Sequence, residues 1–147
     1  MGKKILAVVV GYVVMFAFVF IAFTIAYLAM GTDGAYKPGV YDVTTLWITV
    51  TIILGIIAAI LGGLVCVVIA KDQQAVKILA GVMLVLGLTM AIPAAMGSEE
   101  ETPNVRSGDV AVMDSMQLGR QPLWVAFLNP FIGAAGALIG GRLKKAE

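Results

Sequence analysis

Three adjacent carboxylates, Glu99, Glu100 and Glu101, are the densest group of potential ligands in this chain. Such a triplet could bind a divalent cation or dock on a basic surface. Adjacent side chains point in different directions, however, whereas a calcium loop spaces its oxygen ligands along about twelve residues. A solvated acidic turn therefore explains the triplet better than a metal site, and docking remains the functional alternative.

The most polar point inside an apolar stretch is Asn129, which directly precedes Pro130. A proline inside a helix removes one backbone hydrogen bond and frees a carbonyl group, here that of Ala126. We expect the Asn129 amide to satisfy this distortion, or to bond to Thr51 across a helix interface. The pattern favours structural use of both polar residues over ligand binding.

The remaining composition excludes several kinds of chemistry. Histidine is absent, which removes histidine-ligated haem, the usual zinc and copper sites and histidine acid-base catalysis. The single cysteine, Cys66, cannot form an internal disulfide and is predicted to be a small packing residue. Phosphate loops, nucleophile elbows and basic runs are also missing, and the net charge is only +1. We therefore predict no catalytic residues, no cofactor, no metal and no nucleic-acid partner.

The elements that carry these residues are apolar and long. The 147 residues are 61% hydrophobic and 13% charged, with a mean hydropathy of +1.00, whereas soluble domains are about 45–50% apolar and about 25% charged. Residues 5–30, 45–70, 76–96 and 123–141 each reach the roughly 20 residues that cross a hydrocarbon core. The prediction is an all-α integral membrane protein with a single four-helix transmembrane domain over residues 1–147.

The connections set the expected topology. The first and second spans, and likewise the third and fourth, form two antiparallel hairpins with outer loops at residues 31–44 and 97–122. The connection at residues 71–74 is so short that the second and third spans must also lie antiparallel as a hairpin. Thr44 is among the candidate caps of the second span. In the second outer loop, Val110, Val112, Met113 and Met116 predict a short helix or strand that docks on a partner or on the lipid interface.

The charges divide unequally between the two ends of these spans. Seven Lys and Arg residues should lie at the end with both termini, against three at the other end: Lys3, Lys4, Lys71, Lys77, Arg142, Lys144 and Lys145, against Lys37, Arg106 and Arg120. The positive-inside rule then places both termini in the cytoplasm. The central parts of the spans carry no charged residue, which weighs against a proton relay or an ion path. We expect a multi-pass protein of a bacterial inner membrane.

Small residues recur at helical spacing in the second and fourth spans, where they predict close helix packing. These positions are Gly55, Ala59, Gly62 and Gly63, and then Gly133, Gly136, Ala137, Gly140 and Gly141. A shift of 78 residues superimposes the two stripes and puts Thr51 opposite Asn129. The match raises the possibility of a parallel internal repeat. Chance is the alternative, because small residues are common in membrane helices.

The sequence thus offers packing surfaces and no recognisable active site. The hypothesis is a non-catalytic accessory or structural subunit that packs against a larger respiratory, photosynthetic or transport complex. Its expected partners are membrane lipids and other membrane-protein subunits, or copies of itself. The alternative is a small-solute or ion transporter or channel that acts as an oligomer.

Overall fold

The computed structural model describes residues 1–96 and 103–144, and this part of the chain is all-α without a sheet. Four helices are long and apolar enough to cross a membrane: α1 (Gly2–Ala35), α2 (Thr45–Ala70), α3 (Gln73–Ala95) and α5 (Leu123–Arg142). They confirm the predicted four apolar helices and suggest a multi-pass membrane protein. A short helix, α4 (Val112–Leu118), lies in the second outer loop, so the helical alternative for that segment is confirmed.

Local chemistry accounts for the helix ends. The Thr44 hydroxyl accepts a hydrogen bond from the Trp47 amide at 3.1 Å and so caps α2, as expected of a threonine before the first turn. The Asp72 carboxylate caps α3 in the same way by accepting from the Gln74 amide at 2.8 Å. Near the end of α1 the backbone turns sharply at Gly31, whose φ of 69° and ψ of 175° suit only glycine.

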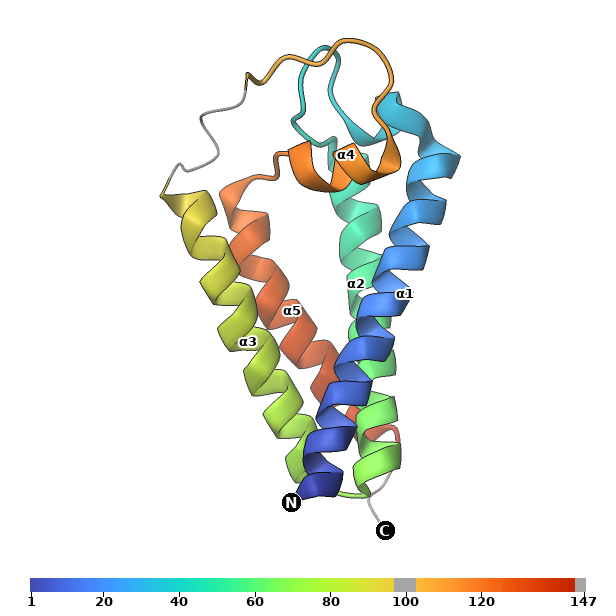
Figure 1. Ribbon diagram of the computed structural model, residues 1–147, viewed down its shortest axis with the longest axis vertical. Coiled ribbons are helices and arrows are strands. Elements are labelled where there is room, and N and C mark those ends of the chain that lie inside the picture. The colour runs from blue at the N-terminus through green and yellow to red at the C-terminus, as the bar shows by residue number, and fades with distance from the viewer. Residues whose placement is uncertain (97–102, 145–147) are drawn as a thin grey trace.

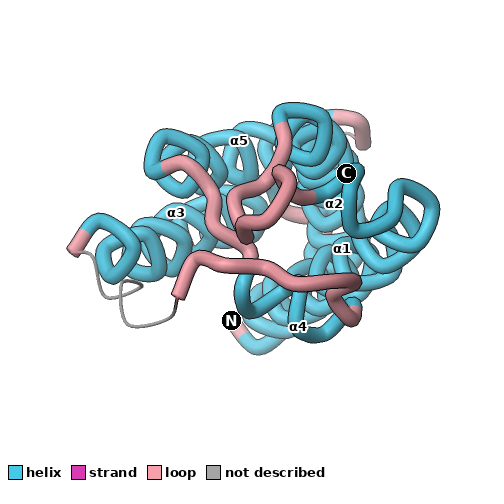
Figure 2. The backbone as a smooth tube through the Cα atoms, turned by 90° about the horizontal axis from the view of Figure 1, so that it is seen from above, coloured by secondary structure: helices cyan, strands magenta, loops and turns pink. Residues whose placement is uncertain are grey.

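The four long helices lie in the order α3, α5, α2, α1 (Figure 2). Helix α5 lies between α2 and α3, and the pairs α1–α2 and α3–α5 are packed along much of their length. The two pairs meet at the end that carries both termini and separate toward the other end (Figure 1). Helices α2 and α3 run in opposite directions from the short connection, as predicted for a hairpin (Figure 1), but each contacts α5 far more than it contacts the other, because α5 lies between them.

Polar contacts tie the chain together at the end with the termini, called here the terminal end. The Lys4 ammonium lies 2.6 Å from the Asp72 carboxylate, and it also donates to the Gln74 side chain. The side-chain amide of Gln73 donates a hydrogen bond to the Gly141 carbonyl oxygen at 2.6 Å, which joins α3 to α5. Above these contacts lies a core that includes Ala7, Cys66, Val76 and Leu79, all fully buried.

The opposite end, called here the loop end, is closed by the two outer loops (Figure 1). The first loop pairs with the second: the Arg120 amide donates to the Tyr41 carbonyl oxygen, and the Val43 amide donates to the Arg120 carbonyl oxygen. Val110 and Val112 pack on the buried cluster around Tyr27. These two valines, expected to meet a partner or lipid, thus pack within their own chain.

Candidate functional site

The small-residue stripes meet at the crossing of α2 and α5. A methyl group added to Gly63 would overlap the backbone of Ala137, with the carbonyl carbon only 2.7 Å away. Gly140 lies equally close to the backbone of Ile60, and a methyl group on Gly136 would be 2.7 Å from the Ala59 Cβ. The two helices are therefore in backbone contact, which only residues without larger side chains permit.

Neighbouring glycines face different helices. Gly62 packs on Gly11 of α1, where an added Cβ would lie 3.0 Å from the carbonyl oxygen, whereas Gly63 faces α5. In α5 the order is reversed, because Gly140 faces α2 and Gly141 faces Val76 of α3. The 78-residue shift aligns Gly62 with Gly140 and Gly63 with Gly141, so it does not superimpose their contacts.

Two members of the stripes lie nearer the loop end and make looser contacts. Gly133 approaches only the tip of the Met83 side chain. A Cβ on Gly55 would meet no atom within 4 Å, so Gly55 makes no close helix contact within the described chain. Both glycines instead border a pocket between the helices.

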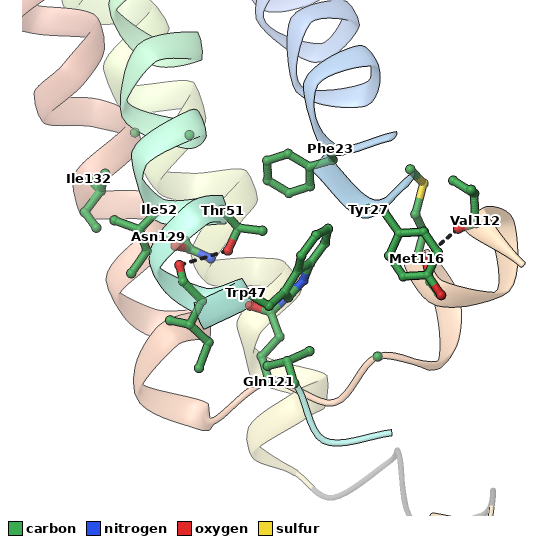
Figure 3. Close-up of a pocket in the computed structure, with 16 residues that line it drawn as sticks. Phe23, Tyr27, Trp47, Thr51, Ile52, Val112, Met116, Gln121, Asn129 and Ile132 are labelled. Atoms are coloured by element: carbon green, nitrogen blue, oxygen red, sulfur yellow. Dashed lines mark hydrogen bonds between the residues drawn. The ribbon is translucent and has the colours of Figure 1, made fainter. Parts of the chain in front are cut away.

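This pocket has a volume of about 360 Å³ and lies under α4, between α1, α2 and α5 (Figure 3). Its lining comes from four helices and the adjoining loops: Phe23, Tyr27, Val43, Trp47, Ile48, Thr51, Ile52, Gly55, Val112, Ser115, Met116, Gly119, Gln121, Asn129, Ile132 and Gly133. None of these described lining residues is charged. One helical turn further toward the terminal end, the contact between Gly136 and Ala59 closes the space between α2 and α5.

An aromatic group forms one wall of the pocket. The Trp47 ring packs edge-on against Phe23 and Tyr27, with centroid distances of 6.1 and 5.9 Å. The Tyr27 hydroxyl donates to the Val110 carbonyl oxygen at 2.7 Å, which fixes the ring beneath the second outer loop. This wall is held both by ring packing and by a hydrogen bond across the loop end.

Two polar side chains of the pocket, those of Asn129 and Thr51, point toward one another beside this wall (Figure 3). The Thr51 hydroxyl donates to the Ile48 carbonyl oxygen of its own helix at 3.0 Å, not to Asn129. Within the described residues the Asn129 side chain has no hydrogen bond, and neither has that of Gln121 at the start of α5. The expected Thr51–Asn129 bond is thus not formed.

Helix α4 covers the pocket and is held in place by a hydrogen bond from Tyr36. The Tyr36 hydroxyl donates to the Ser115 carbonyl oxygen of α4 at 2.7 Å. Burial disfavours the phenolate and raises the pKa of Tyr36 to about 12. The neutral phenol therefore holds α4 in place over the whole physiological pH range.

Sequence reasoning found only part of this site. It singled out Thr51 and Asn129, but it missed the aromatic wall and the cover, because their residues are far apart in the sequence. The only available signal was the apolar spacing of Val112 and Met116, four residues apart on one helix face. The acidic triplet Glu99, Glu100 and Glu101 lies outside the described residues. In the described ranges, no three His, Cys, Asp or Glu residues are grouped to hold a metal ion.

Comparison with protein-family models, with curated proteins and with solved structures finds no match to this chain. Its function is therefore inferred from the geometry above.

Proposed function

We propose that this chain is a non-catalytic accessory or structural subunit whose helix α1 packs against a larger membrane complex. The observation that supports this proposal is the unequal burial of the four long helices. Only 11% of the most apolar window of α1 is buried within the chain, against 33% for each of the other three. Its exposed apolar face, which includes Phe16 and Phe20, is left free for a partner helix or for lipid.

The close packing of α2 and α5 favours a subunit over the alternative of a transporter or channel. A path that continued from the loop end between α2 and α5 would have to pass the backbone contact between Gly63 and Ala137. The spans also lack a central charged residue that could bind an ion or carry a proton.

We place the terminal end in the cytoplasm of a bacterial cell, because most Lys and Arg residues lie at that end. Cysteine labelling tests this orientation in a Cys66→Ala background. Val105 and Leu143 are 71% and 66% exposed at opposite ends of the molecule, so either position accepts a reporter thiol. Val105→Cys should react with an impermeant reagent on intact cells, and Leu143→Cys only after lysis. The opposite result would reverse the orientation.

Co-purification from the native membrane in a mild detergent tests the subunit proposal. Replacing Phe16 and Phe20 by alanine should release the partner proteins identified by mass spectrometry. The matched control replaces Val85 and Met90, which are exposed on α3, and should retain them. Retention in both variants would exclude α1 as the interface. Absence of any stoichiometric partner of the unmodified protein would refute the subunit role.

A further inference from the structure

The pocket under α4 contains polar groups whose hydrogen bonds the described chain does not complete. Asn129 lies six residues into α5, about 9 Å along the helix axis at 1.5 Å per residue. Its side-chain amide has no hydrogen-bond partner among the described residues. A molecule in the pocket could supply these hydrogen bonds.

These polar groups define what such a molecule must offer. An asparagine amide both donates and accepts hydrogen bonds. The Thr51 hydroxyl, in contrast, already donates its hydrogen to the Ile48 carbonyl oxygen, so toward a bound molecule it can only accept a hydrogen bond. A molecule with acceptors alone, such as a quinone, would leave the Thr51 oxygen and the Asn129 carbonyl unmatched. The matching group is a hydroxyl, which donates as well as accepts.

The lining also restricts the charge of the molecule. The described residues around the pocket are apolar, aromatic or neutral and polar, with no charge of either sign. An ionised group would lose its hydration there without gaining a counter-charge, which is strongly unfavourable. This excludes a phosphate, carboxylate or ammonium head group from the enclosed part of the pocket.

The size and position of the pocket favour a lipid over trapped water. A volume of 360 Å³ would take about a dozen water molecules at roughly 30 Å³ each, and most of them would face aromatic or aliphatic side chains. Asn129 itself is exposed, so this side of the pocket is open toward the surroundings of the helices. Acyl chains attached to a head group beside Asn129 can leave the pocket there and enter the bilayer.

We infer that the pocket between α1, α2, α4 and α5 binds the hydroxyl-bearing head group of a neutral glycerolipid, of which diacylglycerol is the simplest. Asn129 and Thr51 bind the glycerol oxygens, while Phe23, Trp47 and Ile132 surround the adjoining apolar part. This site is independent of the proposed contact between α1 and a partner subunit.

Fluorescence quenching tests the inference, because Trp47 lines the pocket whereas the exposed Trp124 does not. The Trp124→Phe protein is placed in phosphatidylcholine vesicles that contain a few mole per cent of diacylglycerol brominated on its acyl chains. Quenching of Trp47 should saturate at low probe content. The same brominated chains on phosphatidylglycerol should quench it only in proportion to their mole fraction.

Two substitutions with a matched control locate the site. Gly55→Leu should abolish saturable quenching by filling the pocket, whereas Gly81→Leu should leave it unchanged, since Gly81 also has open space around it but does not line the pocket. Asn129→Leu should weaken the apparent affinity about tenfold, equivalent to about 1.4 kcal/mol. Proportional quenching by both probes, or equal saturation by phosphatidylglycerol, would overturn the inference. Unchanged binding by Gly55→Leu would also overturn it.

Discussion

Replacing Gly63 by alanine tests the backbone contact on which the whole arrangement of α2 and α5 depends. The added Cβ would lie 2.7 Å from the carbonyl carbon of Ala137 and 2.8 Å from its Cα, whereas ordinary contacts begin at 3.4 Å. The carbonyl oxygen of Ala137 would lie closer still, and all three obstacles are backbone atoms, which cannot rotate away. The two helices must therefore separate by more than 0.7 Å, which is the difference between 3.4 and 2.7 Å for the carbonyl carbon alone.

The cost of this separation follows from the packing. A gap of 0.5–1 Å forfeits about a quarter to a half of the dispersion energy of the contacts involved. Overpacking of a tight interface typically costs about 1–3 kcal/mol. Alanine also gains up to about 1 kcal/mol over glycine from its higher helix propensity, which opposes this loss.

A matched glycine-to-alanine control in the same helix cancels the gain in helix propensity, so that only the effect of the contact remains. Gly55 lies in the same helix, and a Cβ there would meet no atom within 4 Å. Gly55→Ala should therefore be neutral or stabilising, and Gly63→Ala should be about 1–3 kcal/mol less stable than Gly55→Ala. Thermal unfolding in one detergent, followed by tryptophan fluorescence, measures the difference as a lower Tm. Equal Tm values for the two variants would refute the close α2–α5 contact.

Two further predictions concern the two ends of the molecule. Tyr36→Phe should destabilise the loop end by about 1–2 kcal/mol below pH 10, because the partly buried Ser115 carbonyl oxygen loses its donor. Since burial raises the pKa of Tyr36 to about 12, the stabilising contribution of Tyr36 is lost from pH 10 to 12, and the Tm difference between the two proteins should narrow over that range. The hydrogen bond from Lys4 lowers the pKa of Asp72, whose stabilising effect is therefore present at neutral pH and lost as the pH falls through that lowered value. Asp72→Asn, which can still cap α3, should abolish this acid-dependent fall in Tm, and an unchanged fall would exclude the Lys4–Asp72 pair as its source.

At the loop end, local sequence patterns predicted secondary structure and helix caps but not tertiary contacts. The apolar residues of the second outer loop predicted a short helix or strand, of which the structure forms the helix, and Thr44 was correctly among the expected caps. Both predictions depend on neighbouring residues. Which surface α4 would cover was not predictable, since it depends on pairing between distant segments, such as Tyr36 with Ser115, which are 79 residues apart.

The amino-acid sequence by itself determined the four long helices, because each apolar stretch must satisfy its backbone hydrogen bonds internally and ends at a turn or a cap. It also indicated that glycine and alanine would bring helices together. Only the tertiary structure decided which helices meet. Consecutive glycines project about 100° apart, so Gly62 faces α1 and Gly63 faces α5, and this division inserts α5 between α2 and α3. The pocket beside Asn129 forms where the two helix pairs separate, and no single segment of the sequence encodes it.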